Sequence, residues 1–262
     1  MILTDTHTHL YYEADIEKQT GLIERALTNQ VERLFLPNVN TSTIPLVFDL
    51  VKRYPKNCFP MLGLHPCDVK EIANTETQHY LAELDQIKQA ITQHRIYAIG
   101  EIGIDLYWDK RTLDIQKKAF ITQVHWAKEL DLPIIIHCRD AFDELFETLY
   151  IEKDEHLRGI FHCFTGGIEQ AKKIIDLGFY LGIGGVLTYK NSGLNHVIRE
   201  IGLEHIVLET DSPYLAPVPH RGKPNESSFL IHIAQALADI KQISIEEVAR
   251  ITTANSEKIF GV

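Results

Sequence analysis

The segment Pro133-Ile134-Ile135-Ile136-His137 places three isoleucines directly before an imidazole. A short β-branched apolar run predicts a strand buried on both faces, as in a parallel sheet, and the polar residue predicts where it ends. The pattern recurs along the chain, where acidic or imidazole side chains follow other short apolar runs: His7, His9, Glu101, His162 and Asp211. Because the carboxyl ends of barrel strands meet at one mouth, we expect these side chains to form one site.

The apolar runs and the segments between them predict the fold. The runs lie at about 2–6, 32–37, 58–63, 96–100, 133–137, 159–163, 179–183 and 205–209. Segments with helical spacing of apolar residues lie at roughly 14–29, 42–53, 77–93, 112–130, 140–150, 168–177, 192–200 and 228–240. This alternation predicts an α/β fold, a (β/α)8 TIM-type barrel; an open doubly wound sheet is the alternative and usually has fewer strands. Extra C-terminal helices follow, read as two short ones, with Ser244 as a capping residue and Gly261 as a stop.

Length and composition fit a single domain spanning residues 1–262. The chain is 45% hydrophobic and 24% charged, as is usual for a globular protein. Its formal net charge of −10 argues against broad adhesion to nucleic acid, although a nucleic-acid substrate bound at one site is compatible with it. The four cysteines form no CxxC pair, and neither a signal peptide nor a membrane-length apolar stretch is evident. We therefore expect a reduced, cytoplasmic protein with no membrane partner.

The period of a strand, in which residues i and i+2 face the same side, sorts the candidate ligands. His7 and His9 share a face while Thr8 points away, and Glu209 shares a face with Asp211. One pair of histidines two residues apart is weak evidence for a metal. Four further candidates at the same end of the predicted barrel make a metal site the favoured interpretation.

The same period places His137 and Arg139 on the inward face of their strand. Cys138 and Cys163 each follow a candidate histidine, but we expect both to face the helix layer as small buried hydrophobic residues instead of thiolate ligands. The guanidinium fork of Arg139 fits two phosphate oxygens, so we interpret it as a phosphate contact.

The residue types of the predicted site limit the metal and the chemistry. Four imidazoles and two carboxylates suit Zn, Mn, Co or Fe better than Ca or Mg, which prefer oxygen ligands, although Mg stays among the candidates. Six protein ligands are too many for one open catalytic site but are natural for two divalent ions that share a carboxylate. Glu101, from a middle strand, is the candidate bridge. Two-metal sites are typical of phosphoester cleavage.

At this point the chain resembles the TatD-type metal-dependent hydrolases, of the amidohydrolase-like superfamily. Six segments carry the resemblance in the family's order: Asp5–Leu10 (DTHTHL), Gly63–Pro66 (GLHP), Ile99–Asp105 (IGEIGID), His137–Asp140 (HCRD), Phe161–Gly166 (FHCFTG) and Leu208–Leu215 (LETDSPYL). The resemblance implies a barrel, a dinuclear divalent site and phosphodiesterase activity on DNA, typically trimming from the 3′ end. It also implies that one metal is bound by His7, His9 and Asp211, the other by His137 and His162, and both by Glu101.

Further roles follow for residues near the substrate. The resemblance places His65 close to substrate, with a structural histidine at a strand end as the alternative. We expect Glu101, Asp211 and His65 to be catalytic, with Asp211 as the general base. Arg221 is a second candidate substrate contact, in the late segment Arg221–Ser227.

Two departures from the family pattern and one loop complete the sequence evidence. Ser227 replaces a proline in the late segment, and Tyr11 stands where relatives often carry aspartate; neither is expected to affect a ligand. After the fourth strand, Trp108 with the nearby cations could grip a single strand, or this segment could simply begin a helix. Asp105 could contact substrate or cap the loop, and the loop role is slightly favoured.

The function that these residues favour is a metal-dependent hydrolase of phosphodiester bonds, most simply a deoxyribonuclease that trims DNA from the 3′ end. An amide or ester hydrolase on the same site, including an aminoacyl-tRNA deacylase, is the alternative within enzymes. A non-catalytic metal-binding accessory protein is the alternative outside them. The expected partner is DNA, single-stranded or at 3′ ends; the oligomeric state is left open, and a monomer is compatible with the sequence.

Overall fold

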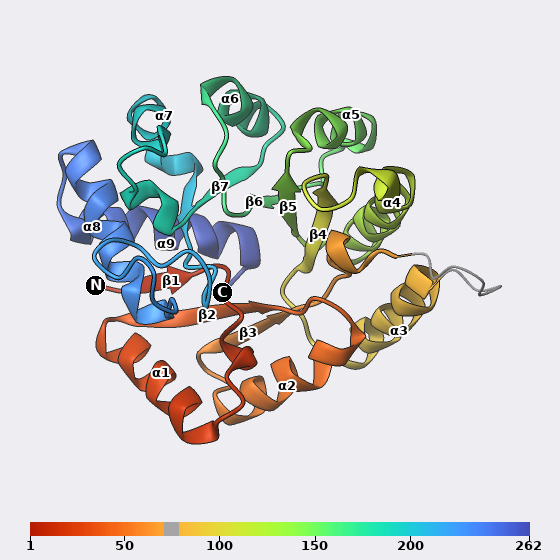
Figure 1. The fold of residues 1–262 in the computed structure, drawn as a ribbon, viewed down its shortest axis with the longest axis horizontal. Coiled ribbons are helices and arrows are strands. Elements are labelled where there is room, and N and C mark those ends of the chain that lie inside the picture. The colour runs from red at the N-terminus through yellow and green to blue at the C-terminus, as the bar shows by residue number, and fades with distance from the viewer. Residues whose placement is uncertain (71–78) are drawn as a thin grey trace.

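The computed structural model describes residues 1–70 and 79–262, and its strands alternate with helices along the chain (Figure 1). The strands are β1 (Leu3–Asp5), β2 (Val31–Pro37), β3 (Cys58–Met61), β4 (Ile99–Asp105), β5 (Ile134–Arg139), β6 (Gly159–Phe161), β7 (Tyr180–Ile183) and β8 (Ile206–Leu208). The helices are α1 (Ile16–Thr28), α2 (Ile44–Arg53), α3 (His79–Gln93), α4 (Leu113–Leu130), α5 (Phe142–Glu152), α6 (Ile168–Asp176), α7 (Leu194–Glu200), α8 (Leu230–Lys241) and α9 (Ile245–Phe260). Figure 1 shows the helices as a ring around the strands.

Backbone hydrogen bonds close the strands into a barrel. Every pairing between neighbouring strands is parallel, within the groups β1-β2-β3 and β4 to β8. The Gly100 N–H donates to Leu62 O at 2.9 Å and so joins β4 to the end of β3. At the other seam, the Asp211 N–H donates to His7 O at 2.9 Å. The ring is therefore complete, which confirms the (β/α)8 prediction over an open sheet.

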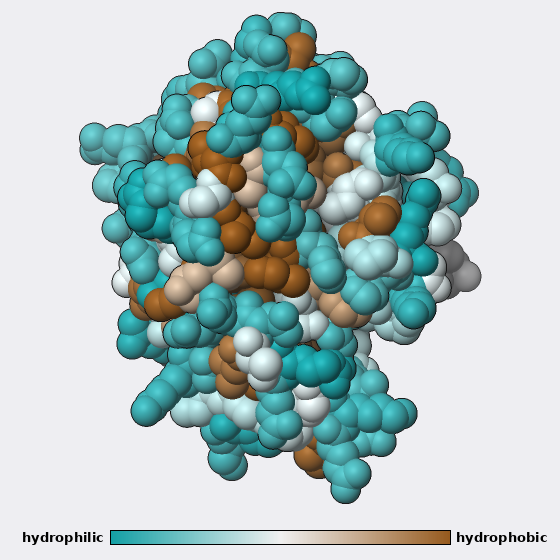
Figure 2. Space-filling view, turned by 90° about the vertical axis from the view of Figure 1, so that its left-hand side faces the viewer, coloured by the Kyte–Doolittle hydropathy of each residue, from teal (hydrophilic) through white to brown (hydrophobic). Residues whose placement is uncertain are grey.

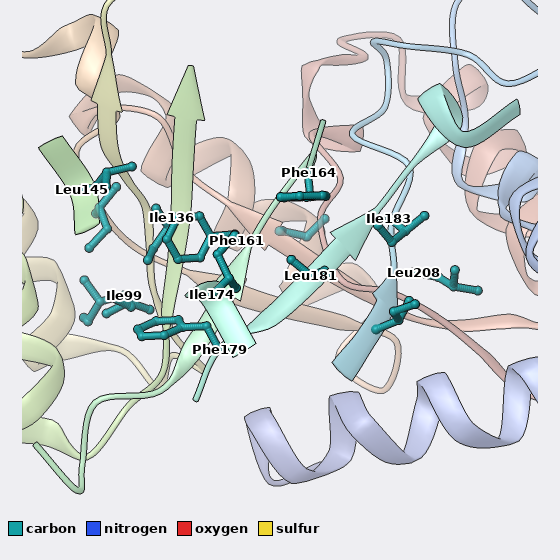
Figure 3. Packing of buried hydrophobic residues seen from close by; sticks show 14 of the residues in the cluster. Ile99, Ile136, Leu145, Phe161, Phe164, Ile174, Phe179, Leu181, Ile183 and Leu208 are labelled. Carbon is teal, nitrogen blue, oxygen red and sulfur yellow. The ribbon is translucent and has the colours of Figure 1, made fainter. Parts of the chain in front are cut away.

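The apolar core divides between the two faces of the strands. In β5, Ile134 and Ile136 pack into the layer between the strands and the helices, a layer that Figure 3 shows around Ile136, Phe161 and Leu181. Ile135, one residue along, faces the barrel interior with Phe35. This alternation is the strand period that the sequence predicted. The ring of Phe260, from α9, stacks on Phe35 with centroids 3.8 Å apart, so α9 closes the amino-terminal end of the barrel.

Two predicted helices differ from those observed. Helix α3 begins at His79, and residues 77–78 of the predicted segment lie outside the described residues. The C-terminal tail forms one helix, α9, so the expectation of two short helices is wrong. No glycine or proline interrupts residues 245–260, and the helix therefore continues through both predicted segments. Its ends are as predicted, because the Ser244 hydroxyl accepts from the Glu247 N–H and Gly261 ends it with a φ of 75°.

The outer surface is mostly polar. Figure 2, which shows the left-hand side of Figure 1, has hydrophilic side chains over most of the face and a hydrophobic area near its centre. Among the described residues, the structure contains no helix that is both long and apolar enough to cross a membrane.

Candidate metal centre

The open end of the barrel contains a cavity of about 690 Å³ at the carboxyl ends of the strands. Five of the six expected ligands line it, and the sixth, His7, is fully buried. His65, Asp105 and Arg139 also line it, together with Trp108 and Tyr214. The expectation that ligands on separate strands converge on one mouth is therefore met.

A first set of donor atoms comes from β1 and β8. His7 Nε2 lies 3.2 Å from His9 Nε2, and Asp211 Oδ1 lies 3.6 Å from the same His9 nitrogen. Glu101 Oε2 lies 3.2 Å from His7 Nε2. Since His7 and His9 follow β1 two residues apart, the strand period brings both imidazoles to the same side, as predicted.

A second set lies beside the first, on β4, β5 and β6. Glu101 Oε1 lies 2.8 Å from His137 Nδ1 and 2.7 Å from His162 Nε2. The two oxygens of Glu101 thus face different sets of imidazoles. Burial alone would raise the pKa of Glu101, but the neighbouring imidazoles of His162 and His65 hold it well below its usual value.

Two residues outside the donor sets determine which ring nitrogen of a candidate histidine ligand is available to bind a metal. The Tyr11 hydroxyl lies 2.9 Å from His9 Nδ1 and donates its own proton to Pro37 O at 2.7 Å. It must therefore accept a hydrogen bond from the Nδ1–H of His9, which leaves the Nε2 lone pair of His9 to face Glu101 and Asp211. Tyr11 is not a ligand, yet it orients one, so the expectation that this departure affects no ligand is wrong in that respect.

Asp105 does the same for His137. Its Oδ2 lies 2.9 Å from His137 Nε2, and a carboxylate accepts, so that nitrogen carries the proton. Nδ1 of His137, 2.8 Å from Glu101 Oε1, is then the ring nitrogen that a bound cation could take as its ligand. Burial raises the pKa of Asp105, but the hydrogen bond and charge of His137, together with the N–H groups of Tyr107 and Trp108, outweigh it and lower the pKa to about 2. Asp105 also accepts from the Tyr107 N–H at 3.0 Å, which bears out its role in the loop.

His65 has the structural role at a strand end, and it also lines the cavity. Its Nδ1 accepts from the Cys67 N–H at 3.1 Å, which caps the short turn after β3. Its Nε2 therefore carries the proton, and it lies 3.2 Å from Glu101 Oε1. Burial lowers the pKa of His65 more than Glu101 raises it, which favours the neutral ring. Such a ring donates a hydrogen bond from Nε2, which suits an anionic oxygen better than a metal.

Glu209 lies behind the second set. Its Oε1 accepts from the Cys163 N–H and lies 3.7 Å from His162 Nδ1, while Oε2 has no partner among the described residues. A side chain at Gly182 would collide with this carboxylate, since an added Cβ would lie 2.2 Å from Oε2. The position of Glu209 favours the orienting role that the sequence left open.

Hydroxyls and a buried carboxylate join β1 to β8 beneath the ligands. Thr8 points away from the cavity, as predicted, and its Oγ1 lies 2.7 Å from Ser212 Oγ and 3.2 Å from Ser227 Oγ. Ser227 therefore packs against the ligand-bearing strand, where a proline could not form this bond. Asp5 accepts from the N–H and hydroxyl of Thr210, and burial raises the pKa of Asp5 to about 7.

The two predicted arginines lie on opposite parts of the rim. Arg139 lines the main cavity, and its guanidinium stacks 3.7 Å above the ring centre of Tyr107. Arg221 does not line it; it lies 4.4 Å above the ring of Tyr189 in a smaller hollow that shares Val186 with the main cavity.

The cysteine prediction is correct in one part and wrong in another. Neither Cys138 nor Cys163 belongs to a set of donor atoms that could hold a metal among the described residues. Both line the main cavity, however, so they do not face only the helix layer. Cys163 follows the end of β6 with a φ of 47°, and the strand period does not extend through a left-handed residue.

The donor atoms fit divalent cations. Two carboxylates, the buried Glu101 and the partly buried Asp211, face the imidazoles. Among the described residues no lysine or arginine lies within ion-pair distance of either. Three groups of donors each lie within 4.8 Å of one another: His7, His9 and Asp211; His7, Glu101 and His162; and His65, Glu101 and His137. The tautomer of His65 argues against its serving as a ligand in the third group.

A closed (β/α)8 barrel with imidazoles and carboxylates gathered at the carboxyl end of its strands belongs to the class of metal-dependent barrel hydrolases. The family model described as TatD related DNase matches residues 4–261, and the chain belongs to this family. A relative from Bacillus subtilis, named uncharacterized metal-dependent hydrolase YabD, is 38% identical over the full length of both chains. YcfH of Escherichia coli, with the same description, is 32% identical over 100% of this chain and 97% of its own. The crystal structure of the TatD homologue YjjV of E. coli has a TM-score of 0.90 at 27% identity and covers 99% of this chain and 98% of that one.

Proposed function

We propose that this protein uses two divalent metal ions to hydrolyse phosphodiester bonds in DNA, removing nucleotides from the 3′ end. The observation that carries the proposal is the position of Glu101, whose two carboxylate oxygens face two separate sets of imidazoles. A carboxylate in that position suits a bridge between two ions. The ions would activate water as Lewis acids and neutralise the charge of the phosphate, whichever of Zn, Mn, Mg, Co or Fe is bound.

The residues of the chain then divide the remaining work. Asp211, held ionised because His9 and the other imidazoles lower its pKa against the effect of burial, takes the proton of the attacking water as general base. The Nε2–H of His65 points into the cavity and donates to a phosphoryl oxygen. Arg139 and Arg221 are cations on the rim where the flanking phosphates of a strand would pass. The family description, TatD related DNase, is consistent with this substrate.

The test is a metal-titrated assay with single-stranded DNA labelled at the 5′ or the 3′ end. The wild type should release nucleotides from the 3′ end, and Glu101→Ala or Asp211→Ala should lower the rate by at least about a thousandfold, with unchanged circular dichroism. Glu129→Ala is the control, because this exposed carboxylate on α4 pairs only with Lys88. Metal-dependent cleavage retained in either site variant would contradict the proposal.

The same preparations distinguish the other functions. Faster turnover of model amides, lactones or aminoacyl-tRNA would favour hydrolysis at a carbon centre. Related barrels of that kind often carry a bridging lysine, whereas this chain has Glu101 at the fourth strand and isoleucines before His137, which favours phosphoesters. Stoichiometric metal binding with no turnover of any substrate would indicate an accessory protein.

A further inference from the structure

The loop after β4 exposes two aromatic rings at the rim of the cavity. The side chains of Tyr107 and Trp108 are 54% and 71% exposed, although large aromatic residues are usually at least partly buried. Their rings meet edge to face, with centroids 4.9 Å apart. The guanidinium of Arg139 lies 3.7 Å from the centre of Tyr107 and 5.5 Å from that of Trp108. The three side chains form one surface, which we call the rim platform.

The rim platform is fixed to the metal centre by one residue. Asp105 Oδ1 accepts from the N–H groups of Tyr107 and Trp108 at 3.0 and 3.4 Å, while its other oxygen accepts from His137. The aromatic rings are therefore held at a set position relative to the ligands. Arg111 does not add to the rim platform as a cation, since it forms an ion pair with Asp109 within the same turn. Among the residues that the structure describes, Arg139 has no carboxylate within ion-pair distance.

The exposed aromatic side chains of the protein gather at the mouth. Of the five in the described part of the chain, only Tyr150 lies elsewhere; the others are Tyr12, Tyr107, Trp108 and Tyr214. The rings of Tyr12 and Tyr214 lie 5.5 and 6.2 Å from the ring of His9, on the side of the first donor set. Because its net charge is −10, this protein has little general electrostatic attraction for the phosphate backbone of nucleic acid. Aromatic faces offer another means of binding, because every base can stack on them whatever its sequence.

We propose that the rim platform stacks an unpaired base of the substrate and is the subsite that holds a single strand while its phosphate lies at the metal centre. The inference rests on the proposed function in one respect: the bond to be cut lies at the metal centre. A base in a duplex cannot reach the platform, since its faces are covered by its neighbours. Double-stranded ends must therefore fray before they are bound.

The experiment compares Trp108→Ala with Trp108→Phe and Tyr150→Ala in the metal-loaded protein. The probe is a single-stranded oligodeoxynucleotide with 2-aminopurine near the 3′ end and phosphorothioate terminal linkages that resist cleavage. Stacking on the platform quenches the probe, and the quench gives Kd. Trp108→Ala should lose the quench and raise Kd roughly tenfold or more, Trp108→Phe should recover much of the binding, and Tyr150→Ala should match the wild type. An abasic site at the probe position should weaken wild-type binding to a similar degree.

Turnover separates this proposal from the proposed function. We expect Trp108→Ala to lower the ratio of kcat/KM for the oligonucleotide to that for bis(p-nitrophenyl) phosphate, which has no base, by about the same factor. If Trp108→Ala binds the probe as wild type does, or if duplex and single strand bind equally, the platform is refuted whether or not DNA is cut. If the probe is quenched as expected but no phosphodiester is hydrolysed, the platform stands and the proposed function fails.

Discussion

The Asp105 carboxylate accepts a hydrogen bond from His137 Nε2 at 2.9 Å, so Nδ1, 2.8 Å from Glu101 Oε1, is the nitrogen of this ring that could bind a metal. The tautomer of a histidine decides which of its nitrogens can bind a metal, and a carboxylate partner enforces that choice. Asp105 lies on β4 and His137 on the neighbouring β5, so the pairing of the two strands sets the orientation of the ring.

Asp105→Asn should weaken metal binding by roughly 10- to 100-fold, because an amide can offer its N–H to His137 and reverse the tautomer. Isothermal titration with Zn or Mn measures the change directly. Asp109→Asn is the matched control: Asp109 lies in the same loop and caps the next turn through the Arg111 N–H, but it contacts no expected ligand. Equal affinities for the Asp105 variant and the wild type would show that the ring needs no such partner.

Tyr11→Phe should lower metal affinity about tenfold, since it removes the hydroxyl that accepts from His9 Nδ1 and leaves that buried nitrogen without a partner. The neighbouring Tyr12→Phe provides a comparison, because the ring of Tyr12 stacks on that of His9 and the variant keeps the ring. Titration of both variants with the same ion gives the result. An unchanged Kd for Tyr11→Phe would mean that His9 is oriented by its ring contacts alone.

Metal removal should destabilise the folded protein, because ions that bind only the folded state shift the unfolding equilibrium. At an ion concentration of one hundred times Kd the gain is about 2.7 kcal/mol, which corresponds to a rise in Tm of roughly 5–10 °C for a chain of this size. Differential scanning calorimetry after chelation and after readdition of Zn or Mn measures it. Glu101→Ala should show a much smaller rise; a shift as large as that of the wild type would place the stabilising ion elsewhere.

High pH should destabilise the fold in part through Cys58. Burial raises the pKa of this thiol to about 12, so the folded state keeps its proton while the unfolded chain loses it above about pH 9. The stabilising contribution is complete below the unfolded pKa and is lost as pH rises, by about 2 kcal/mol between pH 9 and 10.5. Urea unfolding at both pH values should show a steeper loss in the wild type than in Cys58→Ala. Parallel losses in the two proteins would mean that other groups dominate.

Much of the fold could be predicted from the sequence because each strand has two signals, an apolar run and the polar residue that ends it. Ile134 to His137 shows both signals, and the observed β5 covers them. Helix α9 was predicted as two short helices. Ser244 and Gly261 mark the two ends of a single helix, because no glycine or proline interrupts the residues between them. The closing of the barrel depends on hydrogen bonds between β1 and β8 that no local pattern specifies.

The candidate site could also be predicted only in part from the sequence. The convergence of the candidate ligands could be predicted because a metal needs particular donor atoms and the strand period turns them inward. The partners that orient them could not, because Tyr11 reaches His9 by the geometry of a turn and not by a period. The stacking of Arg139 on Tyr107 at the rim of the cavity also depends on a loop. Contacts of this kind follow from the folded structure alone.

Because α9 and Phe260 close the amino-terminal end of the barrel, molecules can reach the cavity only from the carboxyl end of the strands. A barrel sealed beneath its ligands is a blind well, not a tunnel, and whatever enters must leave by the way it came. On the proposed function, the terminus of a strand would enter such a well, and each released fragment would leave by the same opening before the next unit could be bound.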